Sequence, residues 1–457
     1  MQYLMSVLIL SVTMGLYLTE IHVLPSVFKY LPEALSGLLA AYIAVMGPIN
    51  RFRLIAGRYW IVFFSLAVVV VCGVIITTVA PGPLIQGCRF YLRAIPLFFL
   101  PAVFEFSASN IRAQLRLLLA IALLQAPISL YQRYLVFAAG RNSGDPVFGT
   151  LMVSSIMSIF LIGCICVAAA MTLRGRMGKI AFLALFVLLV VPTTINETKG
   201  TLFLLPIGLL ITLIVGSPPN KRLSVGISAI ALLLVFGSLF VPIYDYFSVR
   251  NTQYPYTIEG FFSNKQQVEH YLDPGTDLGS RKGAGRIDSL VVPLQTQLSD
   301  PVQLILGVGI GNGSGSGAGN STTGAYYELF GRYTETSSAA QFLVELGLLG
   351  LGLVLLLYWL IFRDALAVVS RDRSIFGALA LGWLGTTAVM AVGTFYKTMH
   401  YFDSLSYLFW YFSGVIAARR MQLTLATDPL VVRASTALGV LGHTRPLMAR
   451  NRLRAHK

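Results

Sequence analysis

The sequence has few charged residues and very few cysteines for its length. Only 12% of its 457 residues are Asp, Glu, Lys or Arg, whereas a soluble globular protein has about 25%. This scarcity excludes an ordinary soluble domain. All four cysteines fall in apolar stretches, where packing is the expected role: Cys72, Cys88, Cys164 and Cys166. We therefore expect neither a disulfide framework nor a cysteine-rich metal site.

A nucleotide-binding motif is also lacking. Glycine fills seven of the thirteen positions from Gly307 to Gly319, yet no window of this run fits GxGxxG, the chain has no GxxxxGK[ST], and no lysine follows. Only GSGSGA (313–318) meets the relaxed form that ends in alanine, and no helix-forming run follows it. The sequence has no DxD either, which argues against a metal-dependent nucleotide-sugar enzyme. We expect no cofactor and no metal.

Long apolar runs dominate the chain, since 56% of its residues are hydrophobic. A run of about 20 apolar residues can cross a bilayer as a helix, and shorter runs gain length from flanking aromatic or basic residues. The first run lacks the features of a cleaved signal peptide, so we interpret it as a retained helix. We predict an all-α polytopic membrane protein with about 12 transmembrane helices, near residues 2–19, 30–47, 59–80, 84–106, 114–136, 148–172, 179–196, 200–217, 223–243, 337–362, 375–397 and 401–418.

The basic residues predict the orientation of these helices. With the N-terminus inside, most of the 34 lysines and arginines fall in inner loops and in the C-terminal tail, as the positive-inside rule requires. The net charge of +15 is then explained mostly by the basic inner loops and by a basic tail that faces anionic membrane lipid. Nucleic-acid binding is the poorer explanation, and we expect no nucleic-acid partner.

One long hydrophilic insertion interrupts the pattern of short loops. We predict helices 1–9 in residues 1–243, a large outer loop in 244–336, helices 10–12 in 337–418 and a basic cytoplasmic tail in 419–457. A loop of this length is usually functional or disordered. Residues 290–306 have a helical pattern, and we interpret the glycine run after them as a flexible hinge and not as a phosphate cradle.

Two arginines lie inside a predicted span. Arg89 and Arg93 are four residues apart in CRFYLRAIPLFFLP, so they share one helix face, and no acid follows on that helix until Glu105. An unpaired intramembrane arginine costs about 2.5–3.5 kcal/mol on insertion scales. The two arginines therefore either snorkel to the outer interface or bind phosphate. Other cations predicted at the outer face, which could form a basic cavity with them, are Arg133, Arg141, Lys199, Arg286, Arg332 and Lys397.

Two acidic residues also stand out. Glu197 precedes Lys199 in NETKG, where a surface ion pair between the two is one interpretation and a functional carboxylate is the other. Glu345 lies about 12 Å into the tenth predicted span at 1.5 Å per residue. It either pairs with a membrane arginine or orients a substrate, because a carboxylate buried alone in the membrane is costly. The glycines around it favour close helix packing.

Several of these segments, in this order, resemble the O-antigen ligase and O-antigen polymerase family of bacterial membrane glycosyltransferases. RNSGDPVFGTL (141–151) is similar to the stretch before span six of the family, and NETKGTLF (196–203) to its entry to span eight. GRID followed by SDPVQLILGVGIGN resembles the loop arginine, the helix and the glycine signature of the family. QFLVELGLLGLG resembles the segment that opens its span ten. The number of helices and the outer loop between helices nine and ten agree with the GT-C-like fold that the resemblance implies.

One difference from the family bears on its two branches. Ligases of this family have a His-Asn pair shortly before the glutamate of span ten, and the matching residues here are Thr336 and Ser337. This difference favours the polymerase branch. Without that histidine, Glu197, Glu335 or a phosphate oxygen would accept the proton of the attacking hydroxyl. We expect the three histidines that could face outward to be dispensable: His22, His270 and His400.

The resemblance implies a membrane glycosyltransferase that polymerises oligosaccharide repeat units of a surface polysaccharide. The donor would be a glycan on undecaprenyl pyrophosphate, and an acceptor hydroxyl would attack its anomeric carbon with inversion while cations stabilise the leaving pyrophosphate. The residues expected to serve catalysis are Arg286, Glu345 and Glu197. Those expected to bind the pyrophosphate are Arg89, Arg93, Arg141, Lys199, Arg286 and Arg332.

The same resemblance implies the place and the partners of the protein. It would lie in the bacterial inner membrane with its active site facing the periplasm, and it would work beside a chain-length regulator and a flippase. Two alternatives remain open: a ligase that transfers glycan to a lipid acceptor, and a flippase or transporter of lipid-linked oligosaccharide. A flippase commonly has repeated halves, and we find no repeat here.

Overall fold

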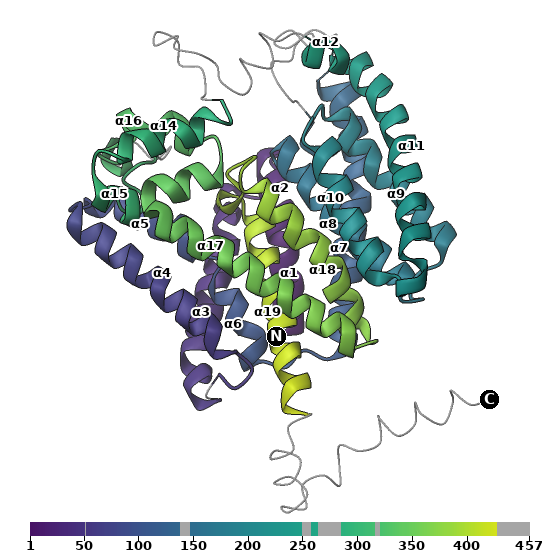
Figure 1. Ribbon diagram of the computed structural model, residues 1–457, viewed down its shortest axis with the longest axis horizontal. Coiled ribbons are helices and arrows are strands. Elements are labelled where there is room, and N and C mark those ends of the chain that lie inside the picture. Colours follow the sequence, from purple (N-terminus) through teal and green to yellow (C-terminus); the bar gives the residue numbers. More distant parts are fainter. Residues whose placement is uncertain (51, 138–146, 249–256, 264–284, 316–319, 427–457) are drawn as a thin grey trace, which may run out of the picture.

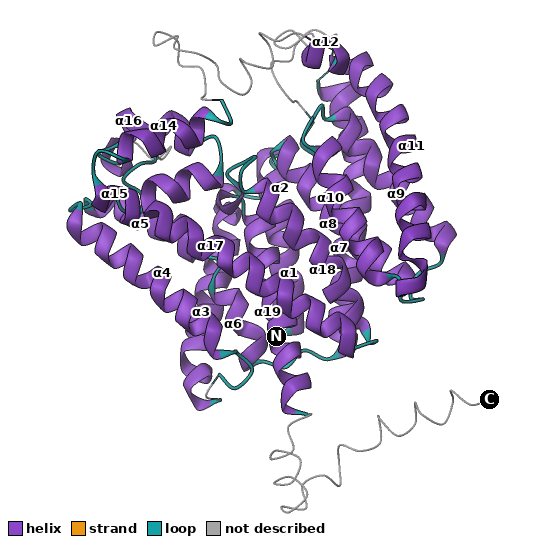
Figure 2. Cartoon of the chain, viewed as in Figure 1, coloured by secondary structure: helices purple, strands orange, loops and turns teal. Residues whose placement is uncertain are grey.

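The computed structural model describes residues 1–50, 52–137, 147–248, 257–263, 285–315 and 320–426 of the chain, and its regular structure there is helical throughout (Figure 2). The first part of the chain forms α1 (Gln2–Leu10), α2 (Leu16–Glu20), α3 (Leu31–Ile49), α4 (Gly57–Ile76), α5 (Pro81–Leu92), α6 (Pro96–Val103), α7 (Ala108–Tyr131), α8 (Ser154–Leu173), α9 (Lys179–Ile195), α10 (Thr201–Gly216) and α11 (Arg222–Ser248). The rest forms α12 (Ile258–Ser263), α14 (Asp288–Gln297), α15 (Pro301–Leu306), α16 (Tyr327–Thr334), α17 (Ser338–Arg371), α18 (Ile375–Gly393) and α19 (Asp403–Leu425).

The chain is all-α, with helices that are long and apolar enough to cross a membrane several times. Eight helical segments of the described residues meet this measure, and they correspond to eight of the twelve predicted spans. The spans predicted at 179–196 and 200–217 are the shorter apolar helices α9 and α10. Those at 84–106 and 401–418 do not meet the measure, so the count of twelve stays a prediction.

The span predicted at 84–106 is divided between α5 and α6 for a local reason. Pro96 begins α6, and because proline has no N–H to donate to the preceding turn, the helical hydrogen-bond pattern is interrupted there, although Ile95 keeps helical backbone angles. The helix therefore stops near Arg93, whose carbonyl accepts a hydrogen bond from the Ser36 hydroxyl of α3. This break places the last turn of α5 beside α3.

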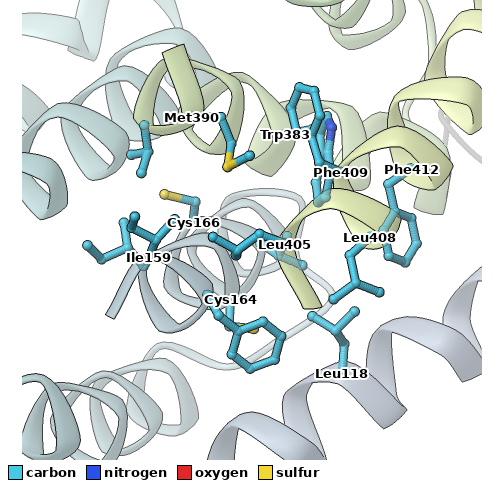
Figure 3. Packing of buried hydrophobic residues seen from close by; sticks show 14 of the residues in the cluster. Leu118, Ile159, Cys164, Cys166, Trp383, Met390, Leu405, Leu408, Phe409 and Phe412 are labelled. Atoms are coloured by element: carbon cyan, nitrogen blue, oxygen red, sulfur yellow. The ribbon is translucent and has the colours of Figure 1, made fainter. Parts of the chain in front are cut away.

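The core lies where α8, α10 and α18 meet. Every residue of α8 from Ser154 to Met171 is buried, and Cys164 and Cys166 are free thiols within it. Glycines allow the close approach: a Cβ on Gly385 would lie 2.3 Å from the carbonyl oxygen of Gly208 in α10. Small residues at such crossings are typical of membrane helix bundles. Figure 3 shows Cys164 and Cys166 among the apolar side chains of this core.

The two ends of the molecule differ. The N-terminus and the C-terminal end of α19 lie at one end, whereas α12, α14 and α16 of the predicted loop lie toward the other (Figure 1). The starts of α3 and α19 also lie at the second end, because the helix or linker before each of them runs away from the end that holds the N-terminus. We refer to it below as the loop end, and to the other as the terminal end.

The first half of the glycine run is a buried, closely packed loop. Gly307, Gly309 and Gly311 all have positive φ, which favours glycine, and the Val308 and Ile310 side chains between them are fully buried. A Cβ on Gly311 would lie 1.9 Å from the Pro83 carbonyl oxygen, and one on Gly307 would lie 2.3 Å from the backbone of Glu345. The interpretation of residues 307–315 as a hinge is therefore wrong.

This glycine loop (307–315) docks where α17 is broken. Gly347 has φ +66° inside α17, and the backbone N–H groups of Val308 and Gly309 donate to the carbonyls of Val344 and Glu345 at 2.8 and 3.1 Å. On the other side, the Thr77 hydroxyl at the end of α4 donates to the Val308 carbonyl at 2.7 Å. The loop thus ties α4, α5 and α17 together at the loop end.

Candidate functional site

A cavity of about 560 Å³ lies between the first helices, α5 and the start of α19. Its charged lining comprises Lys29 and Glu33 around the start of α3, Arg89 and Arg93 of α5, and Asp403 at the start of α19. The spacing of four residues does place both arginines on one face of α5. That face lines the cavity, so a basic group reaches a ligand-sized space at the loop end.

Both arginines of the cavity are paired with acids from other helices. Glu33 Oε1 accepts from Arg89 Nε at 2.7 Å and from Arg93 Nη1 at 3.0 Å. Arg93 Nη2 lies 2.8 Å from Asp403 Oδ1, an ion pair without good hydrogen-bond geometry, and donates to the Tyr401 carbonyl. The Arg93 side chain is 10% exposed and that of Arg89 40%. The prediction of unpaired arginines is wrong, because their partners lie outside their own helix.

Glu345 lies in a buried polar cluster under the glycine loop. Its Oε2 accepts from the Tyr91 hydroxyl at 2.8 Å and from the Gln341 amide at 3.3 Å. The Ser314 hydroxyl and the Gly311 N–H face the same carboxylate, but Oε1 has no partner with hydrogen-bond geometry among the described residues. Because Glu345 is fully buried, it holds the loop and α5 in place and does not itself line the cavity.

Glu197 is buried and pairs with Arg133. Arg133 Nη1 lies 2.7 Å from Glu197 Oε1, with 9% and 3% of the two side chains exposed. The Arg133 guanidinium also lies over the Phe247 ring, 4.2 Å from its centroid. The interpretation of Glu197 as half of a surface pair is therefore wrong. Lys199, two residues on, lies over the Tyr244 ring of α11 at 5.6 Å.

Arg286 reaches the same region from the insertion. Its Nη1 donates to the Thr336 carbonyl at 2.8 Å, and its guanidinium lies 5.0 Å from the centroid of the Tyr396 ring. That ring also lies against the backbone beside Lys199, since a Cβ on Gly200 would be 2.7 Å from its Cζ. Arg286 and the backbone beside Lys199 thus meet at Tyr396, and we call Lys199, Arg286 and Tyr396 the Tyr396 cluster.

His400 lies between the cavity and the Tyr396 cluster. Its Nδ1 is 2.9 Å from the Ser338 hydroxyl at the start of α17, and its ring packs against Tyr91 and Tyr401 at 5.2 and 4.7 Å. Burial, with a smaller contribution from the charge of Arg93, lowers the pKa of His400 to about 3. His400 is therefore a neutral imidazole that contacts Ser338, the residue after Thr336 and Ser337. These two residues themselves have no histidine near them in the sequence.

The remaining predicted site residues are not all brought together. Arg332 lies over the ring of its neighbour Tyr333 at 4.6 Å and donates to the hydroxyl of that residue. Lys397 contributes its carbonyl, which accepts from the Ser338 N–H at 3.2 Å. Arg141 lies outside the described residues. The predicted pyrophosphate set is thus divided between the cavity and the Tyr396 cluster.

Sequence reasoning missed three residues of the site. Glu33 and Asp403 are single acids at the edges of apolar stretches, LPEALSG and YFDSLSY, and a lone acid there normally has a basic partner. That signal could have found both. Tyr91 carries no such signal, because a tyrosine in an apolar helix is commonly packed without a polar role.

The comparisons with known proteins identify no relative: no family model and no curated protein matches the sequence. Among the described residues, no three His, Cys, Asp or Glu side chains are grouped so as to hold a metal ion. The groups available for chemistry at the loop end are therefore guanidinium, ammonium, carboxylate and hydroxyl groups, and these can bind an anion or a polyhydroxyl compound.

Proposed function

We propose that this protein is a membrane glycosyltransferase that polymerises oligosaccharide repeat units linked to undecaprenyl pyrophosphate, at the periplasmic face of a bacterial inner membrane. The observation that carries the proposal is the Tyr396 cluster. Lys199 and Arg286 come from segments almost 90 positions apart, yet Arg286 lies over the Tyr396 ring and Gly200, the residue after Lys199, contacts the same ring. Two cations at the loop end of an apolar helix bundle suit a phosphate group whose lipid chain stays in the membrane.

The chemistry would be electrostatic. The pyrophosphate of the donor lies against Arg286 and Lys199, an acceptor sugar hydroxyl attacks the anomeric carbon, and the bond from that carbon to the phosphate oxygen breaks. Undecaprenyl pyrophosphate leaves with the extra negative charge, which the two cations stabilise. The hydroxyl proton passes to a phosphate oxygen or to a carboxylate such as Glu335. No metal or cofactor takes part.

The acids have separate roles in this proposal. Glu197 accepts a hydrogen bond from Arg133 through Oε1, so it fixes the segment that carries Lys199. Glu345 is a positioning residue, because it is fully buried and bonded to Tyr91 and Gln341. Both stay predicted contributors to catalysis, and Glu345 acts through the loop that it holds.

The direct test is chain extension by purified protein. Lipid-linked repeat units, isolated from a strain that lacks the gene, serve as both donor and acceptor, and products are separated on a gel. We expect extension by the wild type and a loss of about 100-fold or more in Arg286→Ala and Lys199→Ala, as for removal of a group that stabilises developing charge. Arg363→Ala, exposed on α17 toward the terminal end, is the matched control.

The same strain separates the alternatives. Single repeat units on lipid at the outer face indicate a polymerase, and polymer that is not attached to its final acceptor indicates a ligase. Absence of any lipid-linked material at the outer face indicates a flippase. Unchanged chain length in the deletion strain, together with no extension by the purified protein, would refute the proposed function.

A further inference from the structure

The cavity beside Arg89 and Arg93 is distinct from the Tyr396 cluster and has a different chemical character. Its volume of about 560 Å³ is in the range of about 300–1,000 Å³ that holds a small organic ligand. Besides its charged groups, it is lined by the amide of Gln86 and by the aromatic side chains Tyr30 and Tyr401. A polyhydroxyl ring can form hydrogen bonds with amide, carboxylate and guanidinium groups and can pack against aromatic groups.

The charges of the cavity are already balanced to within one unit. Arg89, Arg93 and Lys29 are opposed by Glu33 and Asp403, and Glu33 holds both arginines through a single oxygen. A pyrophosphate placed there would lie beside two carboxylates or would have to break their ion pairs, and breaking a buried pair is costly. The cavity therefore disfavours a multiply charged anion.

The same groups leave several bonding positions for hydroxyls. Glu33 Oε2 and the terminal nitrogens of Arg89 have no partner among the described residues, because the ion pairs use Glu33 Oε1 and Arg89 Nε. The Gln86 amide, which both donates and accepts, has none there either. The Tyr401 hydroxyl is not one of these positions, because it is buried and faces Ser314 and Gln341 beside Glu345. Sugar hydroxyls also both donate and accept, so they match this mixed set.

A short series of contacts connects the cavity with the segment that holds Arg286. Tyr401 lines it and is adjacent in sequence to His400, whose ring contacts Ser338 at the start of α17. Arg286 bonds to Thr336 just before that start. The His400 segment and the start of α17 thus connect the cavity lining with the residues that hold Arg286.

We propose that this cavity is a carbohydrate subsite that binds one or two uncharged sugar rings of the lipid-linked glycan. The assignment rests on the proposed function for the identity of the glycan. Carboxylate and amide groups take the sugar hydroxyls, Arg89 donates from its terminal nitrogens, and the exposed Tyr30 ring at the rim packs against the C–H face of a ring.

The test uses two soluble probes on the full-length protein in lipid nanodiscs. One probe is the oligosaccharide released by mild acid from the lipid-linked repeat units of the deletion strain, and the other is inorganic pyrophosphate. The variants are Gln86→Leu and Tyr30→Ala, which alter a half-buried and an exposed side chain and leave the ion pairs intact. Ile85→Val, on the same helix and 69% exposed, is the matched control.

We expect Gln86→Leu and Tyr30→Ala each to weaken oligosaccharide binding about fivefold, as for the loss of one hydrogen bond or ring contact, and to leave pyrophosphate binding unchanged. Arg286→Ala should weaken pyrophosphate binding and leave oligosaccharide binding unchanged. Oligosaccharide binding equal to that of the wild type in both cavity variants would overturn the assignment. Weaker pyrophosphate binding with unchanged oligosaccharide binding would overturn it too, and would make the cavity the phosphate site.

The outcomes also separate this inference from the proposed function. If the oligosaccharide binds in a Gln86-dependent manner but lipid-linked repeat units are not extended, the carbohydrate subsite stands and the polymerase proposal fails. If the units are extended while the wild type binds no released oligosaccharide, the polymerase proposal stands and the subsite fails. In chain extension, Gln86→Leu should raise KM and leave kcat unchanged, because Gln86 binds the substrate away from the reacting bond.

Discussion

Tyr91 of α5 donates a hydrogen bond of 2.8 Å from its hydroxyl to Oε2 of Glu345 in α17, 254 positions further along the chain. Without that hydroxyl, Oε2 of the buried carboxylate keeps the longer bond of 3.3 Å from the Gln341 amide. A buried acceptor that loses its partner costs about 1–3 kcal/mol. We expect Tyr91→Phe to lower the free energy of unfolding by this amount, measured by denaturation in detergent.

A double-mutant cycle with Glu345→Gln tests whether the loss comes from this bond. If it does, Tyr91→Phe should cost less in the Glu345→Gln background, with an interaction energy of about 0.5–3 kcal/mol. Tyr131→Phe, which alters a side chain that is 52% exposed, should change nothing. Strictly additive effects of the two substitutions would mean that the bond does not stabilise the fold.

The two arginines of the cavity should differ in their effect on stability. Arg93→Met leaves both Glu33 and Asp403 without their shared partner in a largely buried place, which costs about 3–5 kcal/mol. Arg89 is 40% exposed, so Arg89→Met should cost about 1 kcal/mol or less. Thermal unfolding of the two purified variants gives the comparison, and equal loss in both would contradict it.

This difference decides how activity data on the two arginines can be interpreted. If Arg93→Ala loses chain extension, either misfolding or lost ligand binding explains the loss. Arg89→Ala should fold, so a loss of chain extension in that variant reports on ligand binding. Arg93→Met combined with Glu33→Gln and Asp403→Asn should recover part of the lost stability, because no buried charge is then left unpaired. Failure of this rescue would mean that Arg93 acts mainly through packing.

Much of the fold follows from the sequence, because helices in a membrane are marked locally. Each of the twelve predicted spans contains helix, although α11 continues to Ser248, beyond the start predicted for the outer loop at residue 244. The division of the span at 84–106 could also have been anticipated from Pro96. The length that α9 and α10 lack depends on where tertiary packing ends a helix, and a single sequence does not contain that information.

The site was harder to predict, because its pairs join distant segments. The arginines at 89 and 93 were found from their spacing, but their partners Glu33 and Asp403 come from α3 and α19, and only the packing of three helices brings them together. Likewise, the glycine run was noticed but misinterpreted. Alternating glycine predicts either flexibility or close backbone contact, and only the neighbouring backbones of Pro83 and Glu345 show which one applies.

The glycine loop yields a prediction that separates these two explanations. In Gly311→Ala the new Cβ would lie 1.9 Å from the Pro83 carbonyl oxygen, at a residue with φ +78°. The backbone strain alone costs about 1–3 kcal/mol, and the collision adds to it. We expect a clear drop in the thermal midpoint and in the yield of folded protein.

Gly352→Ala is the matched control, because no atom lies within 4 Å of its Cβ position in the helix. It should be as stable as the wild type or slightly more stable, since alanine favours helix over glycine. A Gly311→Ala protein with full stability but slower chain extension would restore the hinge interpretation.

The last prediction concerns pH and His400. In the unfolded chain a histidine has a pKa of about 6.5, whereas burial, with the nearby charge of Arg93, lowers the pKa of His400 to about 3 in the folded protein. Between these values the unfolded chain binds a proton that the folded protein does not bind. His400 therefore makes the folded protein less stable as the pH falls from about 6.5 toward 3. The ring cannot move easily, because Ser338, Tyr91 and Tyr401 surround it.

We expect the wild type to lose thermal stability between pH 7.5 and pH 5, and His400→Gln to lose less, because glutamine does not titrate and can still bond to Ser338. His22→Gln, which alters an exposed residue at the end of α2, should keep the wild-type pH dependence. Chain extension by His400→Gln should persist at pH 7.5, since a histidine with so low a pKa is a poor proton acceptor near neutral pH. Loss of extension in a His400→Gln protein that is as stable as the wild type would make His400 part of the reaction, and the proton would then leave the acceptor hydroxyl through its Nε2 instead of a carboxylate or phosphate oxygen.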